Sequence, residues 1–229
     1  MKNYKTKIYN FTEKKYSIKE LEKIYNLSGE ILKDSTRSVV KLINYDNKKI
    51  VIKIPVEKNK RKWIRFLTLF RKSEILKNLK SMEILLKNGI KTNKPIAGIE
   101  YRKYGMVFDS FMIYEYIEGT VVTKEDAKEV IDLLKKIHKL GYLHNDPQKR
   151  NFLKNEAELI TIDTSLKKKN IFISKILENM EYIKFAVDIS EAYKYIELNK
   201  ISFKLAKFLY NFFRIKRKLS KKLKKILNK

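Results

Sequence analysis

The sequence of 229 residues contains no cysteine. This absence excludes a disulfide-stabilised scaffold, a cysteine nucleophile and a zinc site built from thiolates. A chain without cysteine suits a reducing compartment, so we expect a cytoplasmic protein.

Glycine and proline are also scarce, with six and three residues, which leaves little room for long irregular loops or linkers. Long apolar runs are missing as well. The stretch from Ala206 to Phe213 is interrupted by Lys207 and Asn211 and is far shorter than the roughly 18–20 apolar residues of a membrane-spanning helix. The lysine-rich N-terminus carries no apolar segment of signal-peptide length, so we expect neither export nor a membrane span.

Acidic side chains are the third shortage. The chain has 26 Asp and Glu against 53 Lys and Arg, which gives a formal net charge of +27 and a pI near 9.9. This charge implies an anionic partner, and the candidates are a nucleotide, a nucleic acid, an acidic glycolipid and an anionic membrane surface. Because 44% of the residues are apolar, the chain can still bury a sizeable core.

The first half of the chain is rich in predicted strands. Alternating or continuous apolar residues predict four of them, at residues 39–45, 50–54, 96–104 and 106–117. The first two flank the turn-like sequence Asp46-Asn47-Lys48, which favours a hairpin. Apolar residues at helical spacing over residues 74–88 stop at Gly89 and predict one main helix.

The second half is mostly helical by the same criteria. Thr123 to Asp126 resembles a capping box that opens a helix, and Gly141 ends it. Short strands are predicted at residues 151–154 and 159–162, and helices thereafter. We therefore predict an α+β protein with a small antiparallel β-sheet lobe at residues 1–118 and a reduced helical lobe at residues 119–229.

One loop of the second lobe has the residues that phosphoryl transfer requires. Asp146 and Asn151 lie five residues apart around Pro147, and Asp163 ends the next hydrophobic strand. A carboxylate accepts the proton of the attacking hydroxyl, while an amide oxygen and a second carboxylate bind a divalent metal. The order matches the kinase catalytic loop and the metal-binding aspartate that follows it. In this loop His144 is predicted to be structural, and the nearby His138 to be packed in the core.

The first lobe supplies the remaining candidates. Lys53, on the second strand of the hairpin, occupies the position of the kinase phosphate-binding lysine, and Glu74 follows 21 residues later as its expected ion-pair partner. No G-x-G-x-x-G precedes the hairpin, so we expect Ser35 and Arg37 to meet the nucleotide phosphates. In such a fold the backbone of Glu115, Tyr116 and Ile117 contacts adenine.

The chain also resembles a known family. The resemblance to the lipopolysaccharide core heptose(II) kinase family rests on four segments, Met112–Gly119, Ile137–Gly141, His144–Phe152 and Ile162–Ser165. It implies a compact protein-kinase-like fold, ATP and Mg²⁺ as cofactors, and phosphorylation of a heptose hydroxyl on an anionic, lipid-linked core oligosaccharide. It also implies that Asp146 is the catalytic base, that Asn151 and Asp163 are metal ligands, and that Lys53 contacts phosphate. The chain departs from related loops at Asn145, where a glycine is typical, and at residues 148–150.

A protein substrate is not expected. Only 66 residues follow Asp163, none of them forms an A-P-E sequence, and Asn145 replaces the arginine that binds a phosphorylated activation loop in regulated protein kinases. A basic insert, Lys58 to Lys72, precedes the main helix, and we predict that four of its residues hold the acidic groups of the acceptor. These are Lys60, Arg61, Lys62 and Arg65.

The C-terminal tail, about residues 214–229, alternates basic and apolar residues at helical spacing. It is either a helix that binds an anionic membrane or one whose apolar stripe closes the domain. Nucleic-acid binding is not favoured, because no nucleic-acid motif accompanies the charge. The alternative functions are another small kinase, acting on a sugar, an antibiotic or in tRNA modification, and a catalytically inactive kinase fold that binds RNA or membranes.

Overall fold

The computed structural model describes residues 4–156 and 158–227, with side chains described as far as Ser220. The chain forms two compact units, one of Met1–Glu118 with Thr161–Asp163, the other of Gly119–Ile160 with Thr164–Lys229. Residues 161–163 thus belong by their contacts to the first unit, although the sequence places them in the second lobe. No helix in the described ranges is long and apolar enough to cross a bilayer.

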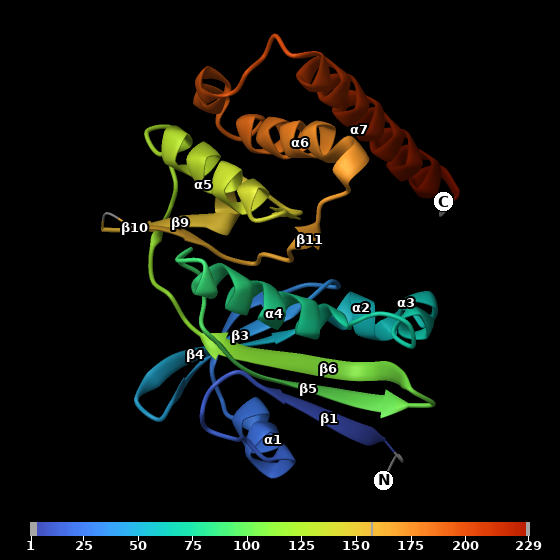
Figure 1. Cartoon of the computed structure of the whole chain (residues 1–229). Helices are drawn as coiled ribbons and strands as arrows, with labels where there is room; N and C mark the ends of the chain where they lie inside the picture. The colour runs from blue at the N-terminus through green and yellow to red at the C-terminus, as the bar shows by residue number, and fades with distance from the viewer. Residues whose placement is uncertain (1–3, 157, 228–229) are drawn as a thin grey trace. The chain divides into compact units, whose positions relative to one another are not determined.

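The first unit is built on an antiparallel sheet of six strands in the order β1-β5-β6-β4-β3-β2 (Figure 1). The strands are β1 (Lys5–Asn10), β2 (Glu30–Asp34), β3 (Val39–Tyr45), β4 (Lys48–Ile54), β5 (Pro95–Lys103) and β6 (Met106–Glu115). Strands β3 and β4 form the predicted hairpin. Its turn residues Asp46 and Asn47 have φ angles of 49° and 58°, a conformation that Asp and Asn tolerate better than most residues.

Helices cover both faces of this sheet (Figure 1). The helices are α1 (Ile18–Asn26), α2 (Val56–Lys60), α3 (Lys62–Leu67) and α4 (Glu74–Lys87). Phe111 and Ile113 of β6 share a buried cluster with Leu21 and Ile24 of α1, whereas Met112 packs against α4. Because successive side chains of a strand point to opposite faces, β6 is apolar nearly throughout.

The expected main helix is therefore confirmed as α4, which ends at Lys87 just before Gly89. The pattern did not predict α1, the short helices α2 and α3, or the outer strands β1 and β2. Ser17 is the N-cap of helix α1. Its side chain accepts a hydrogen bond from the Glu20 N–H, while the Glu20 carboxylate accepts one from the Ser17 N–H. This capping box was present in the sequence, and it marks the start of the helix.

The second unit is mainly helical, with α5 (Ala127–Lys139), α6 (Ser174–Ala186) and α7 (Ile201–Leu227). Its short strands are β7 (Thr120–Val121), β8 (Tyr142–Leu143), β9 (Phe152–Asn155), β10 (Glu158–Thr161) and β11 (Lys167–Lys168). Helix α5 begins at the end of the predicted capping segment, residues 123–126. Asp126 is the N-cap, and its carboxylate accepts a 2.8 Å hydrogen bond from the Thr123 N–H.

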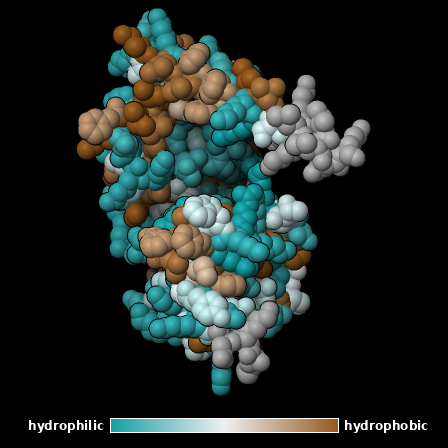
Figure 2. Space-filling model, turned by 90° about the vertical axis from the view of Figure 1, so that its right-hand side faces the viewer, coloured by the Kyte–Doolittle hydropathy of each residue, from teal (hydrophilic) through white to brown (hydrophobic). Residues whose placement is uncertain are grey.

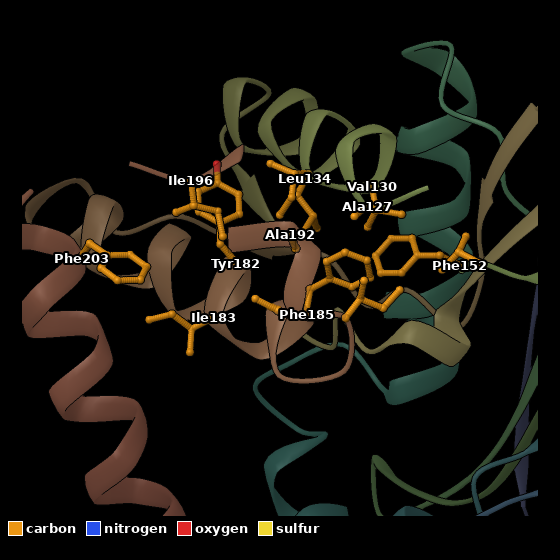
Figure 3. Packing of buried hydrophobic residues seen from close by; sticks show 14 of the residues in the cluster. Ala127, Val130, Leu134, Phe152, Tyr182, Ile183, Phe185, Ala192, Ile196 and Phe203 are labelled. Atoms are coloured by element: carbon orange, nitrogen blue, oxygen red, sulfur yellow. The ribbon is translucent and has the colours of Figure 1, made fainter. Parts of the chain in front are cut away.

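One hydrophobic cluster joins these elements (Figure 3). Leu134 of α5, Phe185 of α6 and Phe203 of α7 all contribute to it, and Phe152 of β9 packs edge-on against Phe185 with ring centroids 5.5 Å apart. Because Phe152 directly follows Asn151, the core holds one end of the predicted catalytic loop.

Among the described side chains of helix α7, those in its first half pack in the core. Phe203 and Ala206 are buried, whereas Ile215 and Leu219, the described members of the tail's apolar stripe, are 57% and 55% exposed. These two side chains do not pack on the domain. For the described part of the stripe, the alternative that the tail's apolar residues close the domain is therefore wrong. Leu223 and Ile226 lie outside the described side chains.

Candidate active site

The predicted catalytic loop lies between β8 and β9 in the second unit. The Asn151 Nδ2 donates to the Asp146 backbone carbonyl at 2.8 Å and lies 3.5 Å from the Asp146 Oδ2. The Gln148 Nε2 donates to the Asp146 Oδ1 at 2.9 Å. Asn145 has a φ of 75°, a left-handed conformation that asparagine tolerates, which explains why it stands where related loops have glycine.

A buried carboxylate from α6 holds this loop in place. Glu181 accepts hydrogen bonds from the backbone N–H groups of His144 at 2.9 Å and Asn145 at 2.5 Å, and its Oε2 lies 2.9 Å from the His138 Nε2. A buried carboxylate needs several such partners because desolvation disfavours its charge. His138 is therefore buried as predicted, but as a hydrogen-bonded member of this network, since its Nδ1 also lies 2.9 Å from the Tyr182 hydroxyl.

Glu181 was not identified from the sequence. The available signal was weak: on α6 it lies one turn before the buried Phe185, so it is an acid placed on the apolar face of a helix.

Lys184, one turn after Glu181, forms an ion pair with the Asp146 Oδ1. Burial opposes ionisation of Asp146, but the hydrogen bond and charge of Lys184 outweigh it, so the pKa of Asp146 lies below its usual value. Asp146 is therefore a carboxylate at neutral pH, the form required of a base. The sequence contains no local signal for Lys184, because the pair joins residues 38 positions apart.

His144 is fully buried, and its ring packs 5.1 Å from that of Phe152. Its Nε2 lies 3.2 Å from the Thr164 Oγ1. Burial lowers the pKa of His144 from 6.5 to about 4, so the ring is neutral under physiological conditions. These are the surroundings of a structural histidine.

In the first unit, Lys53 of β4 forms an ion pair with Asp163. Asp163 lies two residues after the end of β10, and its φ of 52° is in the left-handed region. The predicted partner of Lys53 was Glu74. Within the described residues Glu74 pairs instead with Lys58 at 3.4 Å, because the insert places that lysine beside the start of α4.

The predicted nucleotide contacts lie in the same unit. The Ser35 hydroxyl donates to the Ser38 carbonyl and accepts from the Ser38 N–H, and the Arg37 carbonyl accepts from the Glu57 N–H. These bonds close the β2–β3 turn without glycine, so the Ser35 hydroxyl shapes the turn.

After β6, the N–H groups of Glu115 and Tyr116 donate to the carbonyls of Lys94 and Lys49, both at 2.9 Å. These two N–H groups belong to the residues expected to contact adenine, and both are hydrogen-bonded within the first unit. Ile117 is the third residue of that set.

Two of the four predicted acceptor-binding residues are engaged by other residues of the first unit. Arg61 forms an ion pair with Glu57, and the Arg65 Nε donates to the Asn59 carbonyl at 2.5 Å while its guanidinium lies 4.4 Å from the Phe108 ring centre. Lys60 and Lys62 are exposed. Arg61 and Arg65 thus stabilise α2 and α3, a role that competes with binding an acceptor.

The oxygen donors suit a hard divalent cation such as Mg²⁺, which prefers carboxylate and amide oxygens. In the second unit, Asn151 offers the oxygen of its side-chain amide, and its Nδ2 donates to the Asp146 backbone carbonyl. Asp163 offers a half-exposed carboxylate, and Lys53 an ammonium group suited to phosphate.

Comparison with known proteins adds a family and a fold. The sequence model of a family described as lipopolysaccharide core biosynthesis protein (WaaY) matches residues 1–209. The structure is similar to that of WaaP in complex with acyl carrier protein, at 18% identity and a TM-score of 0.47, covering 84% of this chain and 81% of that chain. A search of curated protein sequences finds no match.

A second similar structure is that of a protein assigned as a fructosamine-3-kinase from Haemophilus somnus. It has 9% identity and a TM-score of 0.52, and the match covers 81% of each chain. At this identity the likeness shows the fold alone. The α+β, kinase-like fold that the sequence predicts is confirmed.

Proposed function

The chain belongs to the family of lipopolysaccharide core biosynthesis proteins (WaaY), as its motifs predict, and we propose that this kinase transfers the γ-phosphate of ATP to a heptose hydroxyl of the inner core. The observation that carries the proposal is the environment of Asp146, an ionised carboxylate held by Lys184, Gln148 and Asn151 within a loop of catalytic type.

Asp146 acts as the base in this proposal. Its Oδ1 accepts bonds from Lys184 and Gln148, so Oδ2 is the oxygen that receives the proton of the acceptor hydroxyl. Asn151 orients the loop and, with Asp163, supplies oxygen ligands to the metal. When bound, Mg²⁺ with ATP supplies the phosphoryl group and neutralises the charge on it.

Lys53 contacts the nucleotide phosphates, and its pairing with Asp163 keeps its ammonium group in place without nucleotide. The β2–β3 turn offers phosphate contacts from its backbone and from Arg37, because the Ser35 hydroxyl is used to close the turn. Adenine recognition falls mainly to the backbone of Ile117, with Glu115 and Tyr116 fixed by the strand. Lys60 and Lys62 attract the acidic acceptor electrostatically.

We place this reaction at the cytoplasmic face of the membrane, where the acceptor is lipid-linked. Exposed apolar side chains beside lysines support that location. Figure 2 shows hydrophobic and hydrophilic residues side by side on one face of the molecule. Ile171 and Phe172 are 90% and 95% exposed and follow Lys167–Lys169, and the described tail exposes Ile215 and Leu219 among basic residues. Such pairs of charge and apolar surface favour an anionic membrane interface.

The test is phosphate transfer from ATP to core oligosaccharide prepared from a strain in which the gene is deleted, followed by mass spectrometry. The wild-type protein should add one phosphate. Asp146→Asn should lower the transfer rate by roughly 10²–10⁴-fold while nucleotide binding persists, because the lost base acts on the acceptor. The matched control is Asp132→Asn, an exposed carboxylate of α5. Equal rates for the wild type and Asp146→Asn would refute the assignment of the base.

Asp163→Asn tests the metal ligand separately. It should weaken ATP binding in the presence of Mg²⁺ and leave the weak metal-free binding little changed, because the carboxylate acts through the metal. Titration with and without EDTA measures both. Loss of binding to the same extent in both conditions would contradict the role.

A further inference from the structure

The second unit contains a pocket of about 250 Å³ beside the catalytic loop. Asn145 and Pro147, the two chain neighbours of Asp146, form part of its wall, and α6 and α7 supply most of the remainder. The volume lies just below the range of small-molecule sites, roughly 300–1,000 Å³, and suits about one sugar ring with a substituent.

The pocket wall is strongly basic. Four cationic side chains line it: Lys167, Lys184, Arg214 and Arg217. Lys184 is paired with Asp146, but among the described residues neither arginine forms an ion pair. The acidic wall residue, Glu181, is already committed to the backbone of the catalytic loop and to His138. The described residues of the pocket wall therefore carry more positive than negative charge.

The remaining wall is apolar and aromatic. Leu177 and Met180 of α6 face the pocket together with Tyr210 and Phe213 of α7. Aromatic side chains pack well against the C–H face of a sugar ring, while paired guanidinium groups bind phosphate or carboxylate oxygens bidentately. The combination matches a sugar that carries an anionic group.

We propose that this pocket binds the anionic group of the acceptor sugar, that Arg214 and Arg217 contact that group, and that binding there presents the acceptor hydroxyl to Asp146. The inference rests on the proposed function, since it concerns the acceptor of that reaction. It assigns acceptor recognition to α7, where neither arginine forms an ion pair with a described residue, in preference to the insert, where Arg61 and Arg65 are engaged.

The experiment measures binding without catalysis, on the full chain, by nuclear magnetic resonance titration with three probes. Glucose 6-phosphate and glucuronate separate the phosphate and carboxylate sources of the charge, and glucose is the neutral reference. The variant is Arg214→Ser with Arg217→Ser. The matched control is Lys216→Ser with Lys218→Ser, which removes the same charge from the same helix outside the pocket wall.

The arginine variant should bind at least one of the charged probes tenfold or more weakly, and the lysine control should bind it within twofold of the wild type. All proteins should bind glucose alike. An equal loss in the two variants would show a general effect of charge and overturn the proposal, as would unchanged binding in the arginine variant. Thermal unfolding of both variants verifies that they fold.

A kinetic arm separates this proposal from the proposed function. With core oligosaccharide as acceptor, the arginine variant should raise the KM for the acceptor at least tenfold and leave the KM for ATP within twofold. If the wild-type protein transfers no phosphate, the proposed function fails, while the binding titration still decides the pocket. If transfer occurs and the acceptor KM is unchanged in the arginine variant, the pocket assignment alone fails.

Discussion

At the residue scale, two side chains of α6 act on the catalytic loop. Lys184 keeps Asp146 ionised, and Glu181 fixes the backbone on its N-terminal side. The arrangement separates two tasks, because one residue controls the charge of the base and another controls its position.

Removing Lys184 should therefore change the pH dependence of the reaction. In Lys184→Met the pKa of Asp146 rises, so the base is protonated at a higher pH and the acidic limb of kcat/KM moves upward in pH. Lys184→Arg should restore the wild-type limb, and Lys175→Met, an exposed lysine of the same helix, should not move it. A rate profile between about pH 5 and 9 measures the limb, and an unmoved limb in Lys184→Met would contradict the role.

His144 should make stability depend on pH. Its pKa is about 4 in the folded chain and 6.5 as the ordinary value, so between these values the unfolded chain binds a proton that the folded chain excludes. Above pH 6.5 His144 therefore does not reduce the free energy of unfolding. As the pH falls toward 4, this free energy decreases by roughly 3 kcal/mol at most. Glu181, Asp146, Lys184 and His138 are the charged or titratable groups that act on the ring.

Urea unfolding of the wild type and of His144→Asn at pH 6.5 and pH 5 measures this contribution. The variant should lose less stability than the wild type over that interval. Identical losses in the two proteins would show that His144 does not titrate in this window.

At the element scale, the described side chains of α7 change from buried to exposed along the helix. Phe203 and Ala206 lie in the core with α5 and α6, Tyr210 and Phe213 border the pocket, and Ile215 and Leu219 are exposed. One continuous helix thus contributes first to stability and then to the pocket wall.

Removal of residues 218–229 should consequently leave the fold and the pocket intact. We expect the free energy of unfolding to change by less than about 1 kcal/mol, whereas Phe203→Ala should lower it by about 3–5 kcal/mol through a cavity in the core. Urea unfolding measures both. Unfolding of the truncated chain would show that the second half of α7 belongs to the core after all. A truncation starting at Arg214 is less informative, because it also removes two pocket arginines.

At the scale of the whole molecule, a net charge of +27 affects every encounter with an anionic surface. The nine basic residues from Arg214 onward are a concentrated part of that charge. Each lysine or arginine close to an anionic membrane contributes roughly 1 kcal/mol at low ionic strength, and screening reduces this contribution.

We predict reversible binding to vesicles that contain phosphatidylglycerol and little binding to phosphatidylcholine vesicles. Raising the salt concentration from about 50 mM to about 500 mM should release the protein, because the Debye length shortens about threefold. The chain without residues 218–229 should bind more weakly at low salt. A sedimentation assay decides it, and equal binding of the full and truncated chains would exclude the tail as the membrane contact.

The features that depend on close neighbours along the chain could be predicted from the amino-acid sequence alone. Asp46 and Asn47 favour the hairpin turn, Gly89 permits the end of α4, and the order of Lys53, Asp146, Asn151 and Asp163 indicated the kinase family. Each of these signals spans a few residues or rests on chain order, so no packing is needed to recognise it.

Which side chains meet depends on how the folded chain packs. Lys53 pairs with Asp163, 110 residues away, and Asp146 pairs with Lys184, 38 residues away. Hydrophobic periodicity shows that a helix has a buried face, but it does not specify which polar side chain at the edge of that face reaches a given loop. That choice depends on the packing of α5, α6 and α7 in one core, which places Glu181 under the catalytic loop and Arg214 and Arg217 in the pocket wall.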